Sequence, residues 1–237
     1  HLLPGVTATV FLADVLIRAA PAGYAVTVLT AVTLSAAYAA IAWALRLLPR
    51  FDPGLRSARD LALFAAVALA GTAAGGALFV GVLAATAPAV FPGFLEPWLR
   101  FWTGDAVGVL VTAPLLLVAA DAERRRAFGA LLRSGEALVQ LVVLSALLWL
   151  IFAGLPGNPA GHFYLLFIPV IWIALRGGMA GAIVAAATVQ IGVVLGMHSL
   201  GVDWLPAVEL QALVAALTLT GLFLGTITDE RSRAEQS

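Results

Sequence analysis

The sequence contains no cysteine and no lysine, and only 11% of its 237 residues are charged. The lack of cysteine excludes disulfides, thiolate metal sites and cysteine nucleophiles. The 13 basic and 13 acidic residues give a formal net charge of zero, so there is no overall basic field to gather nucleic acid, and we expect no nucleic-acid partner. Gly-Lys-Ser/Thr loops, His-Glu-x-x-His and Gly-x-Ser-x-Gly motifs are also missing, so we expect neither catalysis nor a cofactor in this chain.

Apolar residues dominate the chain. They make up 62% of it and the mean hydropathy is +1.03, whereas a soluble domain is about half apolar and a quarter charged. A bilayer crossing takes about 20 mostly apolar residues, so the chain predicts an all-α polytopic membrane bundle of about eight helices. The apolar runs are residues 2–20, 24–48, 59–88, 97–119, 136–154, 162–176, 178–198 and 206–228.

The arginines predict how this bundle is oriented, because cytoplasmic loops carry the excess of basic residues. They cluster in the second, fourth and sixth predicted loops and after the last helix, and this alternation places both termini in the cytoplasm. Arg18 and Arg100 are the exceptions, near the outer face. The clustered residues are Arg46, Arg50, Arg56, Arg59, Arg124, Arg125, Arg126, Arg133, Arg176, Arg231 and Arg233.

Pairs of glycines four residues apart recur along the chain, and such spacing lets helices approach closely. We favour packing inside the bundle over a dedicated dimer face. The pairs are Gly71 and Gly75, Gly177 and Gly181, Gly192 and Gly196, and Gly221 and Gly225.

Two stretches of the chain contain specific combinations of residues. The first has an aromatic residue, Gly-Asp, a further Gly and Pro-Leu, at Trp102, Gly104, Asp105, Gly108, Pro114 and Leu115. The second, residues 163–187, contains Pro169, Trp172, Ala174, Leu175, Arg176, Gly177 and Gly178. Both stretches resemble a known family, the bacterial membrane-associated sensor domain of type one (MASE family). The run from Leu210-Gln211 to Glu230-Arg231 is similar to the family's exit helix, but the usual Trp-Pro first helix does not precede Leu3.

This resemblance implies an input module of the bacterial inner membrane, placed before a histidine kinase, a diguanylate cyclase or phosphodiesterase, or a PAS domain. The polar tail 229–237 follows the last apolar run without a Gly or Pro stop, so we expect 1–228 to be the membrane-embedded sensor domain and 229–237 to begin a cytoplasmic signalling helix. A solvated tail is the alternative. The chain opens with His1, so we expect residues upstream of it. A sensor that feeds a dimeric output is expected to form a homodimer.

Candidate site residues gather on the fourth and first predicted helices. Trp98, Trp102 and Asp105 are spaced i, i+4, i+7, so they share one face, and a carboxylate in hydrocarbon costs about 2.5–3.5 kcal/mol unless it faces the bundle. Asp105 is therefore either a structural hydrogen-bonding residue or a ligand contact. Asp14 and Arg18 are spaced for an intrahelical ion pair, which we favour over direct ligand contact. Arg100 is an interfacial anchor, an anion contact or a partner of Asp105.

Further polar residues lie near the outer ends of the last three predicted helices. They are His162, His198, Asp203 and Glu209. These ligand types suit zinc, iron or copper, but their spacing matches no compact metal motif, and ordinary interfacial polar residues are the favoured interpretation. Glu209 lies inside the final helix, where it could report an event at the outer side.

The leading hypothesis is a sensor whose outer pocket, formed by the first, fourth, seventh and eighth helices, binds a small ligand or a membrane partner and shifts the last helix. Gly221 and Gly225 would keep the sliding surface smooth. A small-solute transporter, or a substrate-binding subunit of one, is the alternative, and a structural partner of another membrane protein is a third reading.

Topology mapping tests the arginine argument directly. Reporter fusions or cysteine accessibility should place positions 56 and 125 in the cytoplasm and positions 158 and 203 outside. Finding Arg125 and Asn158 on the same side of the membrane would contradict the alternating arrangement.

Overall fold

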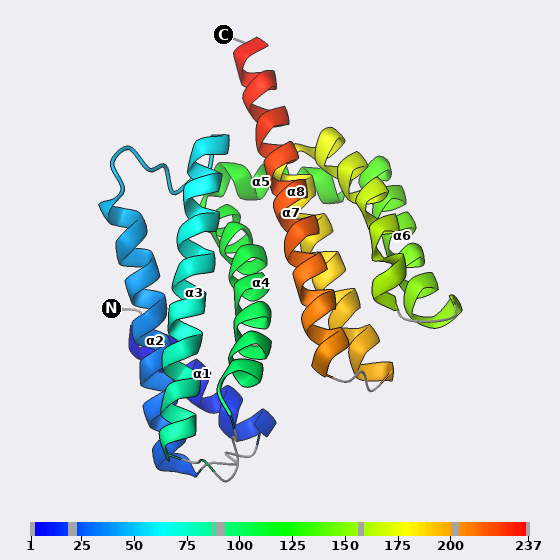
Figure 1. Ribbon diagram of the computed structural model, residues 1–237. Coiled ribbons are helices and arrows are strands. Elements are labelled where there is room, and N and C mark those ends of the chain that lie inside the picture. Colours follow the sequence, from blue (N-terminus) through cyan, green and yellow to red (C-terminus); the bar gives the residue numbers. More distant parts are fainter. Residues whose placement is uncertain are drawn as a thin grey trace. The chain divides into compact units, whose positions relative to one another are not determined.

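The computed structural model describes residues 3–18, 23–86, 88, 93–155, 159–200 and 204–235, and the regular structure of these residues is entirely helical (Figure 1). The all-α membrane bundle predicted from composition is confirmed. The elements are α1 (Leu3–Arg18), α2 (Tyr24–Leu47), α3 (Ala58–Thr86), α4 (Leu95–Ala120), α5 (Ala122–Leu132), α6 (Gly135–Trp149), a π-helical turn η1 (Leu150–Gly154), a 3-10 helix η2 (Pro159–Leu166), α7 (Phe167–Leu200) and α8 (Trp204–Glu235).

Six helical segments of the described chain are long and apolar enough to cross a bilayer, so the predicted count of about eight is slightly too high. There are two reasons. The first predicted helix is only 16 residues long as α1, which is short for a span. The sixth and seventh predicted helices lie within one continuous apolar segment, Pro159–Ser199, which is 41 residues long and is counted once although its chain direction changes inside it.

That long segment contains a reversal of the chain at Gly178. The residue has φ 58° and ψ −150°, a conformation that only glycine adopts readily. A Cβ built on Gly181 would lie 2.7 Å from the carbonyl oxygen of Ile173, although eight residues of straight helix span about 12 Å. The two arms of α7 therefore run in opposite directions, as Figure 1 shows.

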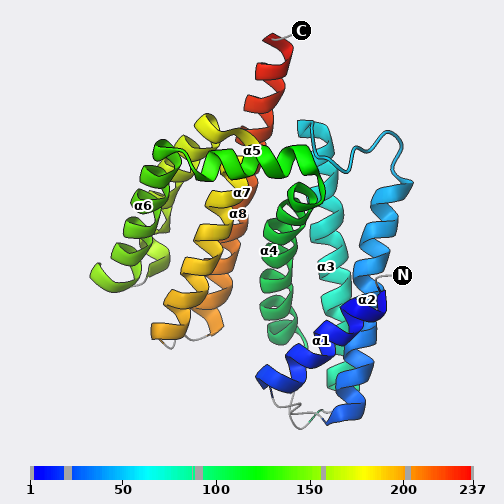
Figure 2. The same cartoon turned by 180° about the vertical axis from the view of Figure 1, so that it is seen from behind.

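The described chain divides into two compact units. The first contains residues up to Phe51 together with Ala66–Ala106, and hence α1, α2, most of α3 and the start of α4. Figure 2 shows α1 crossing α2 obliquely. Apolar residues of α2 and α3 form its core, and Trp98 and Phe101 of α4 pack against them. The buried core residues are Leu34, Phe79, Val80 and Leu83.

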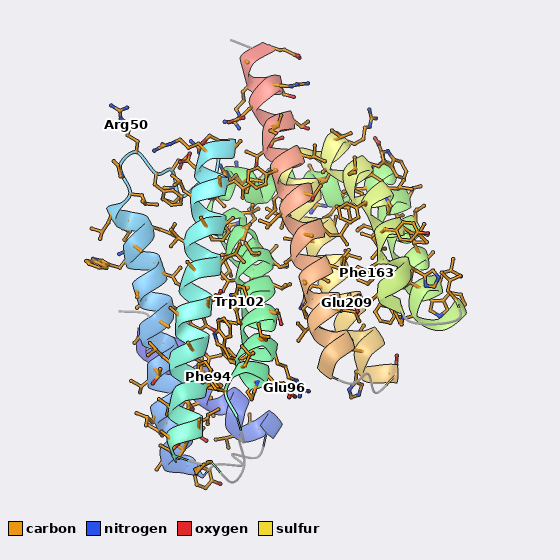
Figure 3. All side chains as sticks on the ribbon, in the orientation of Figure 1. Arg50, Phe94, Glu96, Trp102, Phe163 and Glu209 are labelled. Carbon is orange, nitrogen blue, oxygen red and sulfur yellow. The ribbon has the colours of Figure 1, made fainter. Side chains whose placement is uncertain are left out.

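The second unit consists of Asp52–Ala65 and the residues from Val107 onward. The pairs α6 with α7 and α7 with α8 make its main helix contacts, around a core centred on the fully buried Phe163 and Leu166. Phe163 projects from η2 (Figure 3). Helix α8 continues past this core to Glu235, so the predicted continuation of the last helix beyond residue 228 is confirmed.

The glycine pairs are used for packing inside each unit. In the first unit Gly71 faces Ile41 and Gly75 faces Ala37, which brings α3 against α2. In the second, Gly192 faces Leu148 and Gly196 faces Phe152. Gly221 faces Val170, and Gly225 faces the backbone of the α7 reversal. The preference for packing inside the bundle is therefore supported by all four of the predicted pairs, since Gly181 contacts the opposite arm of α7.

The helix that sequence analysis missed is α5, which occupies the fourth predicted loop. It has 11 residues, among them Arg124, Arg125 and Arg126, and no apolar run that would have marked it. In the second unit α5 lies crosswise to α6 and α7 (Figure 2). Short, arginine-bearing helices with this orientation are typical of the membrane interface.

Replacing Gly178 with alanine should destabilise the second unit. The backbone there lies in a glycine-only region, and a Cβ would also collide with the carboxylate of Asp229. We expect a loss of about 1–3 kcal/mol, measured as thermal unfolding in detergent. The adjacent Gly177→Ala is the matched control, because its Cβ would meet only Leu131 at 3.4 Å, an ordinary contact distance. Equal unfolding temperatures for the two variants would contradict the reversal.

Candidate functional site

One face of α4 carries the predicted group of aromatic residues and a carboxylate. The rings of Trp98 and Trp102 are stacked, with centroids 5.5 Å apart and an interplanar angle of 9°. Both indoles point at α3, where Trp98 Nε1 donates to the carbonyl oxygen of Ala73 (2.9 Å) and Trp102 Nε1 donates to that of Leu69 (3.1 Å). Trp102 lies between α3 and α4 in Figure 3. The shared face predicted from the i, i+4, i+7 spacing is confirmed.

Asp105 lies on the same face, against α2. The hydroxyl of Tyr38 donates to Asp105 Oδ1 at 2.5 Å, so the carboxylate has a polar partner on another helix. The prediction that Asp105 faces the bundle rather than lipid is therefore confirmed. Its second oxygen, Oδ2, is buried and has no hydrogen-bond partner among the described residues. The carboxylate thus retains the capacity to accept a further hydrogen bond.

Close packing beside this group comes from a small residue on α3. Phe101 stacks on Phe79 with centroids 4.4 Å apart, and its Cδ1 atom would lie 3.1 Å from a Cβ at position 76. Gly76 therefore lets the aromatic residues of α4 approach α3. The result is a carboxylate with one donor, flanked by indole rings whose N–H groups are already bonded. We call Tyr38, Trp98, Trp102 and Asp105 the aromatic-carboxylate site.

Tyr38 is the member of this site that sequence analysis missed. It stands in the middle of an apolar span, where a phenolic hydroxyl needs a partner because no water is available. That requirement was the usable signal. The partner could not be identified, since a single sequence does not reveal which helices are adjacent.

The other predicted site residues are not joined to this cluster. Arg100 is exposed on α4, and the side chains of Asp14 and Arg18 lie outside the described residues, so their ion pair stays a prediction. His198 and Glu209 are exposed and belong to the second unit. Asp203 lies outside the described residues, and no group of three His, Asp or Glu residues in the described chain could hold a metal ion.

A second arrangement, also missed, holds the end of α8 within the second unit. Three hydrogen bonds make it up: Met179 N donates to Asp229 Oδ2 (3.1 Å), Ala58 N donates to Glu230 Oε1 (3.1 Å), and Arg233 Nη2 donates to the carbonyl oxygen of Arg56 (2.8 Å). We call these three contacts the exit collar. Their sequence signal was the Asp-Glu pair directly after the last apolar run.

The exit collar satisfies backbone groups that helix ends leave unpaired. Ala58 is the first residue of α3, whose N–H has no partner within the helix, and Glu230 supplies one. Ser57 precedes it, and its hydroxyl oxygen accepts from the N–H of Asp60 at 3.1 Å. Met179 N–H is exposed by the reversal at Gly178 in the same way, and Asp229 accepts from it. The end of α8 is therefore bonded to the start of α3 and to the turn of α7.

Comparison with known proteins gives one match. The MASE1 family model matches residues 1–232 of the chain, nearly its whole length. No curated protein and no solved structure matches the sequence.

The hydrogen bond between Tyr38 and Asp105 can be tested by removing one hydroxyl. Tyr38→Phe leaves a buried carboxylate without its donor, and we expect a destabilisation of about 1 kcal/mol in thermal unfolding. Tyr24→Phe is the matched control, since Tyr24 begins the same helix and is 68% exposed. In the Asp105→Leu background, which has no acceptor for the Tyr38 hydroxyl, the effect of Tyr38→Phe should disappear. Additive effects of the two substitutions would contradict a direct bond.

Proposed function

This chain belongs to the MASE1 family of membrane sensory input domains of signalling proteins, and we propose that it senses a small ligand or a membrane partner at the outer side of the bacterial inner membrane. The signal passes through α8 to a cytoplasmic output domain, a histidine kinase or a cyclic-di-GMP enzyme, and the whole protein is a homodimer through that output region. The arginine distribution supports placing the exit collar on the cytoplasmic side.

The aromatic-carboxylate site is the proposed place of sensing. An unpartnered, buried carboxylate oxygen in a membrane helix is expensive to maintain, and such residues are usually functional. A ligand or partner group with an N–H or O–H would pair with Asp105 Oδ2, and the neighbouring indoles would provide apolar contact. This open acceptor is the observation that carries the sensing proposal.

Helix α3 is suited to carry the signal, because it has hydrogen bonds both to the sensing site and to the exit collar. The indoles of α4 hold it at Leu69 and Ala73, and the carboxylate of Glu230 holds its first residue, Ala58. Ala58, Leu69 and Ala73 belong to one continuous helix. Movement of α3 at the sensing site would therefore change the hydrogen bond between Ala58 and Glu230 in the exit collar.

The signal itself is a change in the balance between two arrangements of α8. A ligand changes that balance only by its differential affinity, and 1.4 kcal/mol changes the ratio about tenfold. Exchange of the three collar bonds for bonds with water lies in this energy range.

Sliding of α8 over a smooth glycine face explains signal transmission less well than the sequence suggested. A Cβ at Gly225 would lie 2.6 Å from the carbonyl oxygen of Gly178, so this position is a point of close backbone contact. Leucine there would disturb folding as well as signalling. We therefore replace the sliding surface expected at Gly221 and Gly225 by a mechanism centred on the exit collar.

Output of the full-length protein tests this coupling. Tyr38→Phe should change kinase autophosphorylation or cyclic-di-GMP formation severalfold, because it alters the sensing site. Glu230→Ala, which removes the bond between α8 and α3, should also change output, and in its background the effect of Tyr38→Phe should disappear.

Two controls accompany this test. Glu235→Ala removes an exposed carboxylate from the same helix beyond the collar, and Tyr24→Phe repeats the hydroxyl loss at an exposed position, so both should leave output unchanged. Additive effects of Tyr38→Phe and Glu230→Ala would rule out α3 as the carrier. Solute uptake by proteoliposomes with no change in enzymatic output would favour the transporter alternative instead.

A further inference from the structure

A large cavity lies beside the exit collar, entirely within the second unit. Its volume is about 880 Å³, which is within the usual range for small-molecule sites. It is bounded by the residues before α3, by α5, by the reversal of α7 and by the end of α8. The lining residues include Leu55, Arg56, Asp121, Arg124, Leu131, Arg176, Gly178, Met179, Thr228, Asp229, Ser232 and Arg233.

The lining is rich in arginine for a site in so apolar a chain. Four of the 13 arginines line it, at positions 56, 124, 176 and 233, against two carboxylates, Asp121 and Asp229. One of these carboxylates is directed at a backbone group, since Asp229 Oδ2 accepts from Met179 N–H. Arg176 is paired with Glu136 in a two-pronged contact of 2.6 and 2.9 Å. Arg124 also contacts Asp121 at 3.7 Å, so the net positive charge of the lining is small and is shared among Arg56, Arg124 and Arg233.

The guanidinium groups of Arg56, Arg124 and Arg233 each have N–H donors that their hydrogen bonds within the protein do not use. Each has five N–H donors. Arg124 uses Nη1 on the carbonyl of Gly54, and Arg233 uses Nε and Nη2 on backbone oxygens. Arg56 makes only a long contact of 3.9 Å to Asp52, and its side chain is 59% exposed. These bonds fix the arginines in position while leaving N–H groups for a ligand.

Planar guanidinium groups bind phosphate oxygens in pairs, and several arginines around one cavity are the usual recognition device for that group. The cavity also contains a hydroxyl donor, Ser232, and lies beside the interfacial helix α5. In the orientation that the arginine distribution predicts, the cavity lies at the cytoplasmic interface, where both phospholipid headgroups and soluble phosphate compounds are present.

We propose that this cavity binds a phosphate-bearing anion, held by Arg56, Arg124 and Arg233. The occupant would contact α8 at Arg233 and the residues before α3 at Arg56, so it would bridge the two elements that the exit collar joins. Binding itself does not depend on the proposed sensory function. If both hold, the cavity gives the signalling helix a second input, from the lipid headgroup or from a soluble phosphate.

The test uses the purified chain in nanodiscs, with thermal unfolding as the readout. In one arm zwitterionic phosphatidylcholine is replaced stepwise by anionic phosphatidylglycerol; in the other, inorganic pyrophosphate is added to phosphatidylcholine nanodiscs. A saturable rise of several degrees is expected in at least one arm. A rise with phosphatidylglycerol alone identifies a lipid headgroup, and a rise with pyrophosphate identifies a soluble anion.

Two variants and one control decide whether the cavity is responsible. Arg56→Gln retains the carbonyl that accepts from Arg233, so the collar persists, and the concentration of anion needed for half the rise should increase at least tenfold. Arg124→Gln should act in the same direction. Arg126→Gln removes the same charge from α5 at an exposed position that does not line the cavity, and should behave as the unmodified chain. No rise in either arm, or equal losses in Arg56→Gln and Arg126→Gln, would overturn the proposal.

Discussion

Polar groups inside a bilayer must find partners in the protein, because no water is available to them. This constraint determines how the helices are held together. The indoles of Trp98 and Trp102 bond to carbonyls of α3, and the hydroxyl of Tyr38 bonds to Asp105 on α4. Each of these bonds joins two different helices. The few polar side chains of the first unit therefore specify which apolar helices are neighbours, a choice that apolar contacts alone leave open.

The second unit has a comparable requirement at its polar end, where helix ends leave backbone N–H groups without a helical partner. The start of α3 and the turn of α7 each leave an N–H without a helical partner, and carboxylates of α8 accept from both. Helix α8, which we propose carries the signal to the output domain, thus also caps the start of α3 and the turn of α7. A displacement of α8 would consequently remove the caps of two other elements.

Local patterns predicted much of this structure. Apolar runs located the long helices to within a few residues, and the spacing of Trp98, Trp102 and Asp105 gave their common face, because these features depend only on helix geometry and hydropathy. The partners of those residues required knowledge of helix adjacency, so Tyr38 was missed. The exit collar and the arginine-lined cavity were missed for the same reason, since Arg56 and Arg233 are far apart in the sequence. The count of spans was too high at the first predicted helix, which is only 16 residues long as α1.

The reversal at Gly178 also fixes the rotational phase of a helix. A helix turns about 100° for each residue, so the single residue between the two arms of α7 determines which side of the second arm faces α8. One inserted residue would rotate the buried stripe that contains Ala182, Val189 and Val193 away from its neighbours. Ordinary loops absorb such changes in length. Here the length of the turn is part of the packing, so natural variation in chain length must be accommodated elsewhere in the chain.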